Sequence, residues 1–347
     1  MLKASYRKYI LHFKEPSGTS RGVLREKETY YIRIWDDADD SVIGLGECAL
    51  FRGLSADDRP DYESHLQQVC RQIHRWETLP LEGWSSMRFG IEMALADLRQ
   101  GGRRICFPSS FTAGVAGIEI NGLIWMGDRE LMLQRIQEKL ESGFHCIKLK
   151  IGAIDFESEL DLLKYIRRRF GKQEVELRVD ANGAFAPEIA LTKLEALAKY
   201  DLHSIEQPIR QGQWKEMARI CALSPIPVAL DEELIGVEDK ALKEELLTQI
   251  RPQYLVLKPA LTGGFSGAEA WIRLAERQGI GWWITSALES NVGLNALAQW
   301  TYGLKNPLPQ GLGTGLLYTN NIPSPLYLAA EKLYYDPERA WDLVSIV

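Results

Sequence analysis

Charged residues end a series of short apolar runs at regular intervals along the middle of this chain. In chain order these residues are Lys150, Asp180, Glu206, Asp231 and Lys258. They follow one another at steps of about 25 to 30 residues, the length of one strand, one helix and the loops that join them. Burying a charge costs free energy unless it is paired or binds a metal, so five strands that end in this way predict a shared polar centre. The spacing itself predicts a parallel barrel.

The second part of the chain contains eight candidate strands, separated by amphipathic segments. They read GIEING, CIKLKI, VELRVD, LHSIEQ, IPVALD, QYLVLK, GWWITS and QGLGTG. The helix evidence is clearest over residues 128–140, where Asp128 can cap the first turn and Gly143 can end the helix. The first 115 residues differ, because two strand-like runs, YYIRIW and SVIGLGE, precede helical patterns. We therefore predict an α/β chain with a barrel from residue 116 and a smaller α+β domain before it.

The composition is that of a globular enzyme without a nucleic-acid or membrane partner. Hydrophobic residues make up 46% and charged residues 25% of the chain, which is enough apolar material for a large core. The formal net charge is −6, and no block of Lys and Arg is present. The sequence shows no signal peptide and no apolar run of about 18 residues, so a cytoplasmic protein is expected. The five cysteines include no CxxC pair, which favours reduced thiols.

Three carboxylates end three successive strands: Asp180, Glu206 and Asp231. In a barrel the carboxyl ends of the strands meet at one face, so these side chains can approach one another. Ligation by oxygen alone favours Mg²⁺, with Mn²⁺ as a second choice. The alternative is that each acid caps the next helix or pairs with a neighbouring lysine.

Two lysines, Lys148 and Lys150, lie two residues apart and therefore on the same side of one strand. If that side faces the barrel interior, burial and a nearby dication lower their pKa, which suits a general base. Lys258 would approach from the opposite wall. The alternative places these lysines outside the barrel, in salt bridges to helices. A metal-bound carboxylate can accept electron density when its α-proton leaves, so we predict proton abstraction from a small-molecule carboxylate.

This set of lysines and acids resembles the enolase superfamily, in particular its muconate-lactonising subgroup. The resemblance implies a modified (β/α)8 TIM-type barrel over residues 116–321 and an N-terminal α+β capping domain over 1–115, with a tail from about 322 to 347 that packs back on the cap. It also implies that Lys150 removes the α-proton, that Lys148 adjusts Lys150, and that Lys258 is the opposing cation. The implied metal ligands are Asp180, Glu206 and Asp231, with Asn182 and Glu232 as their neighbours.

Four phrases, EINGLIW, RVDANGAF, ITSALESNVGL and GLGTGLL, look most like the o-succinylbenzoate synthase family of this subgroup. That resemblance implies loss of water from 2-succinyl-6-hydroxy-2,4-cyclohexadiene-1-carboxylate to give o-succinylbenzoate in menaquinone biosynthesis. The expected contacts to the succinyl end are Ser286, Ser290, Gly311 and Gly313. The alternative for these four residues is ordinary tight turns. From the first domain, Phe51, Leu54 and a loop over residues 17–26 resemble segments that close over the substrate.

Other functions remain open for the same pattern. N-acylamino acid racemases and other epimerases or cycloisomerases of the subgroup share the lysines and acids. Dipeptide epimerases commonly show an Asp-x-Asp pair at the eighth strand, where this chain has Gly311, Leu312 and Gly313. That difference argues against a dipeptide substrate. A barrel that binds a carboxylate without turning it over is the last alternative, and simple binding would not require so many desolvated charges.

Overall fold

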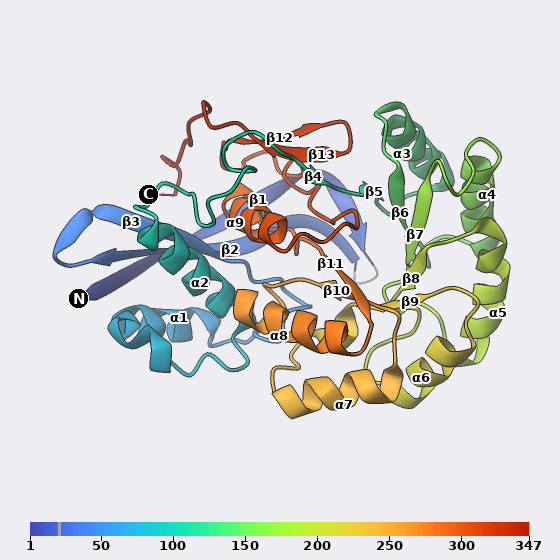
Figure 1. Cartoon of the computed structure of the whole chain (residues 1–347), viewed down its shortest axis with the longest axis horizontal. Helices are drawn as coiled ribbons and strands as arrows, with labels where there is room; N and C mark the ends of the chain where they lie inside the picture. The colour runs from blue at the N-terminus through green and yellow to red at the C-terminus, as the bar shows by residue number, and fades with distance from the viewer. Residues whose placement is uncertain (20–21, 347) are drawn as a thin grey trace.

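The computed structural model describes residues 1–19 and 22–346 (Figure 1). The N-terminal part begins with an antiparallel sheet in the order β1-β2-β3. Its strands are β1 (Leu2–Thr19), β2 (Gly22–Asp36) and β3 (Asp39–Cys48), and the helices α1 (Tyr62–Arg71), η1 (Ile73–Thr78) and α2 (Ser85–Arg99) follow. We call this sheet and its helices the cap. The expected loop over residues 17–26 is instead the tip of the β1–β2 hairpin, where Ser17 pairs with Leu24; residues 20 and 21 lie outside the described residues.

Helix α2 packs closely against β3, and two glycines make this contact possible. A Cβ atom at Gly46 would overlap the carbonyl oxygen of Gly90. Asp97 of α2 accepts a hydrogen bond from the backbone N–H of Leu45 (2.9 Å) and pairs with Arg104 (2.8 Å). The helix is therefore fixed to the strand and to the chain that leaves it. Residues 101–117 form neither helix nor strand, and the domain boundary expected at residue 115 stays a prediction.

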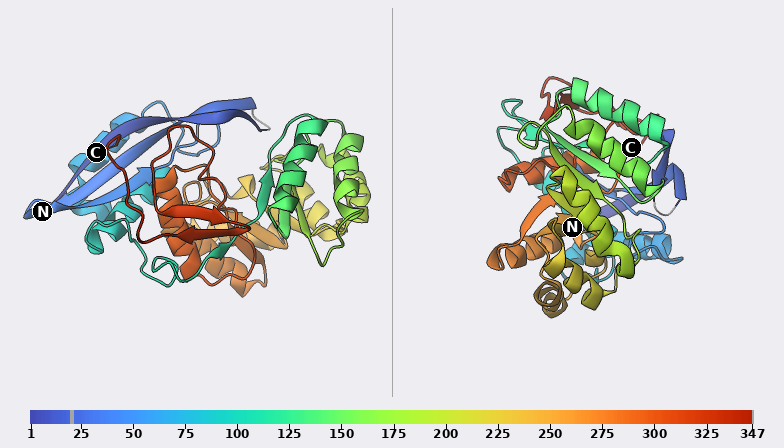
Figure 2. Two further views of the ribbon diagram at one scale, coloured as in Figure 1. Left: turned by 90° about the horizontal axis from the view of Figure 1, so that it is seen from above. Right: turned by 90° about the vertical axis from the view of Figure 1, so that its right-hand side faces the viewer.

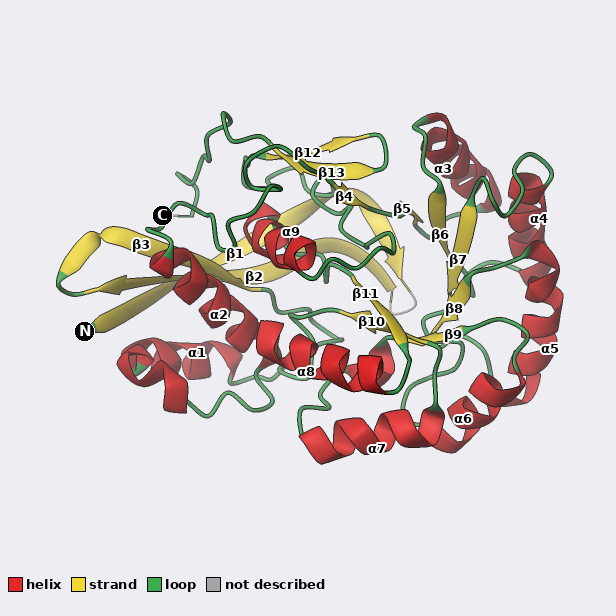
Figure 3. Ribbon diagram, viewed as in Figure 1, coloured by secondary structure: helices red, strands yellow, loops and turns green. Residues whose placement is uncertain are grey.

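Seven parallel strands form the second sheet, in the order β11-β10-β9-β8-β7-β6-β5. The strands are β5 (Gly122–Ile124), β6 (Cys146–Lys150), β7 (Glu176–Asp180), β8 (Ser204–Glu206), β9 (Val228–Leu230), β10 (Tyr254–Leu257) and β11 (Gly281–Ile284). The helices between and after them are α3 (Arg129–Glu141), α4 (Phe156–Arg167), α5 (Pro187–Leu197), η2 (Ala198–Tyr200), α6 (Trp214–Leu223), η3 (Glu232–Leu234), α7 (Lys240–Ile250), α8 (Gly264–Arg277) and α9 (Asn291–Gly303). Figure 3 shows α3 to α8 along the outer side of the strands. The predicted α/β barrel with an N-terminal cap is confirmed.

The barrel closes through two residues where the sequence predicted an eighth strand. Gln310 bridges Ile120, and Gly311 bridges Thr285, so this short link joins the two edges of the seven-stranded sheet. The side chain of Gln310 adds to the closure, because the backbone N–H of Ile284 donates to its Oε1 (2.7 Å). An amide side chain thus replaces part of the backbone ladder that a full strand would supply.

Two of the eight predicted strands are therefore corrected. In QGLGTG, glycine at every second position of residues 311–315 leaves one face without side chains to pack, and no strand forms there. In GIEING, β4 (Ile118–Glu119) pairs with a C-terminal strand over Lys332–Tyr335, β13, in a separate sheet, and the barrel strand begins only at Gly122. The other six predicted strands coincide with β6 to β11.

The C-terminal tail returns to the chain that enters the barrel. Strands β12 (Leu326–Ala329) and β13 (Lys332–Tyr335) form an antiparallel sheet with β4, in the order β12-β13-β4. Before them, the chain passes beside the cap strand β1, where Phe13 bridges Tyr318. Both termini lie at the end of the molecule that the cap forms (Figure 2).

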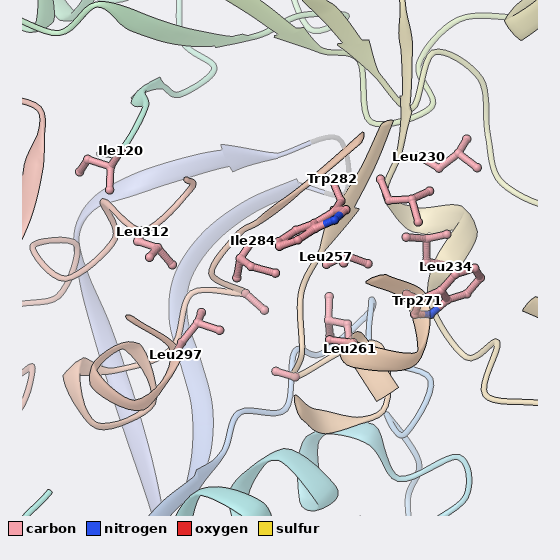
Figure 4. Packing of buried hydrophobic residues seen from close by; sticks show 14 of the residues in the cluster. Ile120, Leu230, Leu234, Leu257, Leu261, Trp271, Trp282, Ile284, Leu297 and Leu312 are labelled. Carbon is pink, nitrogen blue, oxygen red and sulfur yellow. The ribbon is translucent and has the colours of Figure 1, made fainter. Parts of the chain in front are cut away.

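One apolar cluster fills the barrel and continues under its helices. Figure 4 shows part of it, with Leu257 at the end of β10, Ile284 at the end of β11 and Trp271 on α8. Leu312, directly after the closing link, is fully buried in the same cluster. Packing therefore anchors a link that has few backbone hydrogen bonds. None of the helices in the described ranges is long and apolar enough to cross a membrane.

Candidate active site

A cavity of about 200 Å³ lies between the carboxyl ends of the barrel strands and the cap. The cap side is formed by Leu24, Phe51, Arg52, Gly53 and Leu54. The barrel side includes Lys148, Lys150, Asn182, Glu232 and Lys258. The chain after β11 and around the closing link adds Ser286, Ala287, Leu288, Gly311, Gly313 and Thr314. The three lysines, both cap residues and three of the four succinyl contacts that the sequence singled out therefore face one space.

The lysines and acids at the strand ends form one buried group, which we call the strand-end cluster. Its members are Lys148, Lys150, Asp180, Glu206, Asp231 and Lys258. The Nζ atom of Lys148 lies 2.9 Å from Oδ2 of Asp180 and also contacts Glu206. The Nζ atom of Lys150 lies 2.7 Å from the same oxygen of Asp180. This geometry follows from the parallel register, which places Lys150 beside Asp180 and Asp180 beside Glu206.

Ionic partners set the pKa of the buried groups in this cluster. Burial disfavours the ammonium of Lys148, but the carboxylates of Asp180 and Glu206 outweigh it and raise its pKa. Burial likewise opposes the charge of Lys258, and Asp231 and Glu206 raise its pKa. The sequence predicted a lowered pKa for Lys148 beside a dication; next to the carboxylates of Asp180 and Glu206 its pKa is raised instead.

The two central acids of the cluster differ from each other. At Asp180, burial favours the neutral form, but Lys148 and Lys150 outweigh it and hold the pKa below its ordinary value. At Glu206, burial and the charge of Asp180 raise the pKa well above its ordinary value, against the attraction of Lys148. Two carboxylates on neighbouring strands thus compete for the same lysines, and one of them gains most of the stabilisation.

The donor chemistry of the three acids suits a divalent cation. They are buried carboxylates at adjacent strand ends, and Oε1 of Glu206 has no hydrogen-bond partner in the described part of the chain. As they stand, no three His, Cys, Asp or Glu side chains within residues 1–19 and 22–346 are arranged to hold a metal ion. Lysine ammonium groups contact the carboxylates instead. A cation at Asp180, Glu206 and Asp231 would therefore replace those lysine contacts.

Asn182 links Lys150 to a neighbouring acid. Its Oδ1 accepts a hydrogen bond from Nζ of Lys150 (2.8 Å), and its Nδ2 donates to Oε1 of Glu232 (3.0 Å). The backbone of Asn182 is left-handed (φ 44°), a conformation that Asn adopts more readily than most residues. Asn182 and Glu232, expected to flank the metal ligands, thus form one hydrogen-bonded chain with Lys150.

Sequence reasoning missed Gln207, which directly follows Glu206 and is fully buried. Its Oε1 accepts a hydrogen bond from the backbone N–H of Asp231 (3.1 Å), and its Nε2 donates to the carbonyl oxygen of Ile209 (3.0 Å). Gln207 therefore fixes the backbone of Asp231 relative to the end of β8. The sequence offered one sign of this role: Gln207 directly follows Glu206, the acid at the end of a strand.

Ser286 and Ser290 occupy different environments, although both were expected to contact the substrate. Ser286 lines the cavity, and its hydroxyl accepts a hydrogen bond from Thr314 (2.8 Å) and donates to Glu289. Ser290 does not line the cavity; it is the N-cap of α9, and its hydroxyl donates to Glu47 (2.6 Å). A serine directly before a helix can accept a hydrogen bond from a free N–H group of the first turn, and Ser290 does so from Val292. We therefore correct its role from substrate contact to helix cap.

A second group of buried ions joins the cap to the barrel, and we call it the cap–barrel cluster. It consists of Lys27, Glu47 and Glu289. The carboxylate of Glu47 accepts hydrogen bonds from the hydroxyl of Thr29 (2.9 Å) and from the backbone N–H groups of Ser290 (3.0 Å) and Gly293 (2.8 Å). With the hydroxyl of Ser290, these bonds place a negative charge from the cap at the N-terminus of α9, where a helix favours it. Sequence reasoning missed Glu47, although it ends the apolar run SVIGLGE.

Comparison with known proteins identifies the family. Residues 131–327 match the family described as enolase C-terminal domain-like. The chain belongs to the enolase superfamily. The o-succinylbenzoate synthase of Desulfotalea psychrophila is 47% identical to it, over 94% of this chain and 96% of that protein.

Solved structures agree with this assignment. The crystal structure of MenC from Desulfotalea psychrophila matches the chain with a TM-score of 0.83 at 44% identity, over 96% of this chain and 99% of that one. The L-Ala-D/L-Glu epimerase of Bacillus subtilis matches with a TM-score of 0.82 at 21% identity, over 96% of this chain and 95% of that one. The second likeness concerns the fold alone.

Proposed function

We propose that this chain is an o-succinylbenzoate synthase. As a hydro-lyase it removes water from 2-succinyl-6-hydroxy-2,4-cyclohexadiene-1-carboxylate and releases o-succinylbenzoate, as a step of menaquinone biosynthesis in the cytoplasm. The observation that carries the proposal is the 47% identity to the Desulfotalea psychrophila synthase over 94% of the chain. The cavity supports it, because three lysines face a space of about 200 Å³ that is closed on one side by apolar cap residues.

In this proposal Lys150 carries both proton steps. It is held by Asp180 (2.7 Å) and Asn182 (2.8 Å), and it removes the α-proton of the substrate. The protonated Lys150 then gives this proton to the departing hydroxyl group on the same face, so that one water leaves and the ring becomes aromatic. Lys258 follows β10, four strands from the strand of Lys150, and presents its positive charge to the ring from the other side.

The acids of the strand-end cluster would hold a divalent cation, Mg²⁺ or Mn²⁺. Such a cation supplies positive charge to the substrate carboxylate while electron density moves onto it. Asp180, Glu206 and Asp231 are the proposed ligands, and Asn182 and Glu232 hold the groups around them. Lys148 then loses its contacts to Asp180 and Glu206 and can contact the substrate carboxylate. Loss of carboxylate partners lowers the pKa of a buried lysine, which is the direction that a base requires.

N-acylamino acid racemisation is the second candidate. One observation favours it: Lys150 and Lys258 approach the cavity from separate strands, which suits removal of a proton on one face and its return on the other. Dipeptide epimerisation is less consistent with the site, because Gly311 and Gly313 line the cavity where an Asp-x-Asp pair would bind a substrate ammonium.

The decisive experiment incubates the purified protein with the cyclohexadiene acid and Mg²⁺ and follows the ultraviolet absorption of the aromatic product. We expect product with Mg²⁺ and none after chelation with EDTA. Parallel incubation with an N-succinyl amino acid in deuterium oxide reports α-proton exchange. Exchange without dehydration would replace the proposal by the racemase, and neither reaction in a folded, metal-loaded protein would favour a binding protein.

A further inference from the structure

A second cavity, of about 300 Å³, adjoins the first at the seam where the barrel closes. We call it the outer cavity, and the cavity of the lysines the inner cavity. Five residues line both: Asn121, Leu123, Trp125, Gly313 and Thr314. The two sides of the seam are bridged at Ile120 and Gln310, and no later bridge joins them within the described residues. Side chains rather than a hydrogen-bonded ladder therefore separate the two cavities.

The β1–β2 hairpin of the cap crosses over the outer cavity. The backbone N–H of Lys14 donates to the carbonyl oxygen of Leu317 (2.9 Å), beyond the closing link. Glu15 pairs with Arg135 of α3 (3.0 Å). The outer cavity is thus bounded by the cap hairpin, by the chain after the link and by α3.

Two ammonium groups of the outer cavity, those of Lys14 and Lys139, form no ion pair among the described residues; Lys14 is exposed, whereas Lys139 is partly buried. The charged residues that line this cavity are Lys14, Glu15, Arg135, Glu138 and Lys139. The ammonium of Lys139 forms no ion pair within the described part of the chain and lies 4.7 Å from the ring centre of Phe144. Burial lowers the pKa of Lys139, although the charge of Glu138 opposes this shift. The ammonium of Lys139 is therefore partly desolvated, and no carboxylate contacts it to compensate. An anionic ligand would lower the free-energy cost of burying this charge.

The shared wall holds a second group without a partner. Asn121 is only 5% exposed, and its Oδ1 has no hydrogen-bond partner among the described residues. The oxygen and nitrogen of an Asn amide exchange places when the group turns over, so this side chain can offer a donor or an acceptor. A ligand that crosses the seam would pass it.

The cations that line the inner cavity are all paired with carboxylates already. Lys148, Lys150 and Lys258 contact the acids of the strand-end cluster. Arg52 pairs with Asp58 (2.7 Å) and with Glu28. In the proposed reaction these three lysines serve the reacting end of the substrate, even when a cation replaces their contacts to the acids. Among the described residues that line the two cavities, an ammonium group without an ion pair then lies across the seam, and burying a second carboxylate unpaired would be costly.

We propose that the outer cavity is a carboxylate subsite in which Lys139 binds the terminal carboxylate of the succinyl arm. Asn121 hydrogen-bonds the arm where it crosses the seam, and the reacting end stays with the lysines of the inner cavity. This inference rests on the proposed function, which supplies a substrate with two carboxylates. Lys139 then contributes to substrate affinity and not to the proton steps.

The test compares Lys139→Met and Lys139→Arg with Lys199→Met, which removes an exposed charge outside both cavities. Calorimetry measures the binding of o-succinylbenzoate, and of its derivative amidated at the succinyl carboxyl, to each metal-loaded protein; KM and kcat are measured in parallel. For Lys139→Met we expect a Kd for o-succinylbenzoate and a KM about tenfold higher, or about 1.4 kcal/mol, with kcat nearly unchanged. Lys139→Arg and Lys199→Met should stay near the unmodified protein, and the amide should bind equally to Lys139→Met and the unmodified protein.

The outcomes separate the two proposals. An unchanged Kd in folded Lys139→Met overturns the subsite, and so does an equal weakening of the acid and the amide, since the contact would then not involve the carboxylate. Absence of dehydration by the unmodified protein overturns the proposed function, while the binding measurements still decide the subsite. Should Lys139→Met fail to fold, Lys139→Gln takes its place with the same expected values.

Discussion

One buried ionic cluster, the strand-end cluster, lines the active-site cavity, and the other, the cap–barrel cluster, lies behind Ser286, which donates to Glu289. The two differ in what satisfies their carboxylates. In the strand-end cluster the partners are flexible side chains: Lys148 and Lys150 share one oxygen of Asp180. In the cap–barrel cluster, Glu47 binds the backbone N–H groups of Ser290 and Gly293. A lysine side chain can rotate away from its partner, whereas a backbone N–H moves only with its helix. We infer that the first cluster can exchange partners for ligands and that the second holds the cap on the barrel.

Lysine itself behaves in opposite ways in the two clusters. Lys148 contacts two carboxylates directly, and they raise its pKa against the effect of burial. Burial lowers the pKa of Lys27, whose Nζ has no hydrogen-bond partner among the described residues, although Glu47 and Glu289 attract it. Burial alone therefore does not decide the charge of a lysine; direct contact with a carboxylate does.

The largest expected effect comes from the strand-end cluster. Lys150→Ala should lower turnover about 10²- to 10⁴-fold, because it removes the proposed base, while the protein stays folded. Circular dichroism and Mg²⁺ binding serve as controls. Lys199→Met, which removes an exposed lysine, should keep full activity. Retention of most activity in a folded, metal-loaded Lys150→Ala protein would contradict the assignment of the base.

The cap–barrel cluster should respond in stability. Glu47→Ala leaves the buried N–H groups of Ser290 and Gly293 without their acceptor, so we expect a loss of about 3 kcal/mol in the free energy of unfolding. Urea unfolding of the metal-free protein measures it. Glu47→Gln keeps one acceptor oxygen and should lose less. A Glu47→Ala protein as stable as the unmodified one would show that the cap is held by other contacts.

We expect a metal ion to bind at the strand-end cluster, where lysine side chains can leave the carboxylates, and not at the cap–barrel cluster. Mg²⁺ at about 100 times its Kd should raise the free energy of unfolding by about 2.7 kcal/mol, because only the folded chain brings the three acids together. Glu206→Gln should remove this increase, and Glu289→Gln should keep it. Thermal unfolding with and without Mg²⁺ gives the comparison. An equal increase in Glu206→Gln would place the metal elsewhere.

The smallest effect concerns pH. Burial raises the pKa of Glu289 above its ordinary value of 4.5, so the folded protein keeps a proton that the unfolded chain has lost. This group therefore makes the protein less stable as pH rises from about 4.5 through the raised pKa. Glu289→Gln removes that loss and should be more stable than the unmodified protein by about 1 kcal/mol at pH 8, with a smaller difference at pH 5. A difference independent of pH would contradict the raised pKa.

Much of the fold could be predicted because its signals are local. Asp128 was expected to cap a helix, and its Oδ1 does accept the N–H of Leu131 (2.8 Å) at the start of α3. The two-residue spacing of Lys148 and Lys150 placed both on one side of a strand, and both line the cavity. Ser290 was misread, since the same Ser can cap a helix or bind a substrate, and only its neighbour in space, Glu47, decides. The eighth strand was predicted wrongly, because the glycines at every second position of QGLGTG have no side chains to pack against a neighbouring layer.

By itself the sequence determined the order of the six strands β6 to β11, the charges at the strand ends and the family to which they point. These depend on the spacing of apolar and charged residues within short segments, which the chain carries without folding. Only the tertiary structure decided which charges touch. Lys148 meets Glu206 across a neighbouring strand, Glu47 of the cap meets the first turn of α9, and Lys139 is left without a carboxylate. Such contacts depend on register and packing between distant segments, and the same residues could have been paired in other ways.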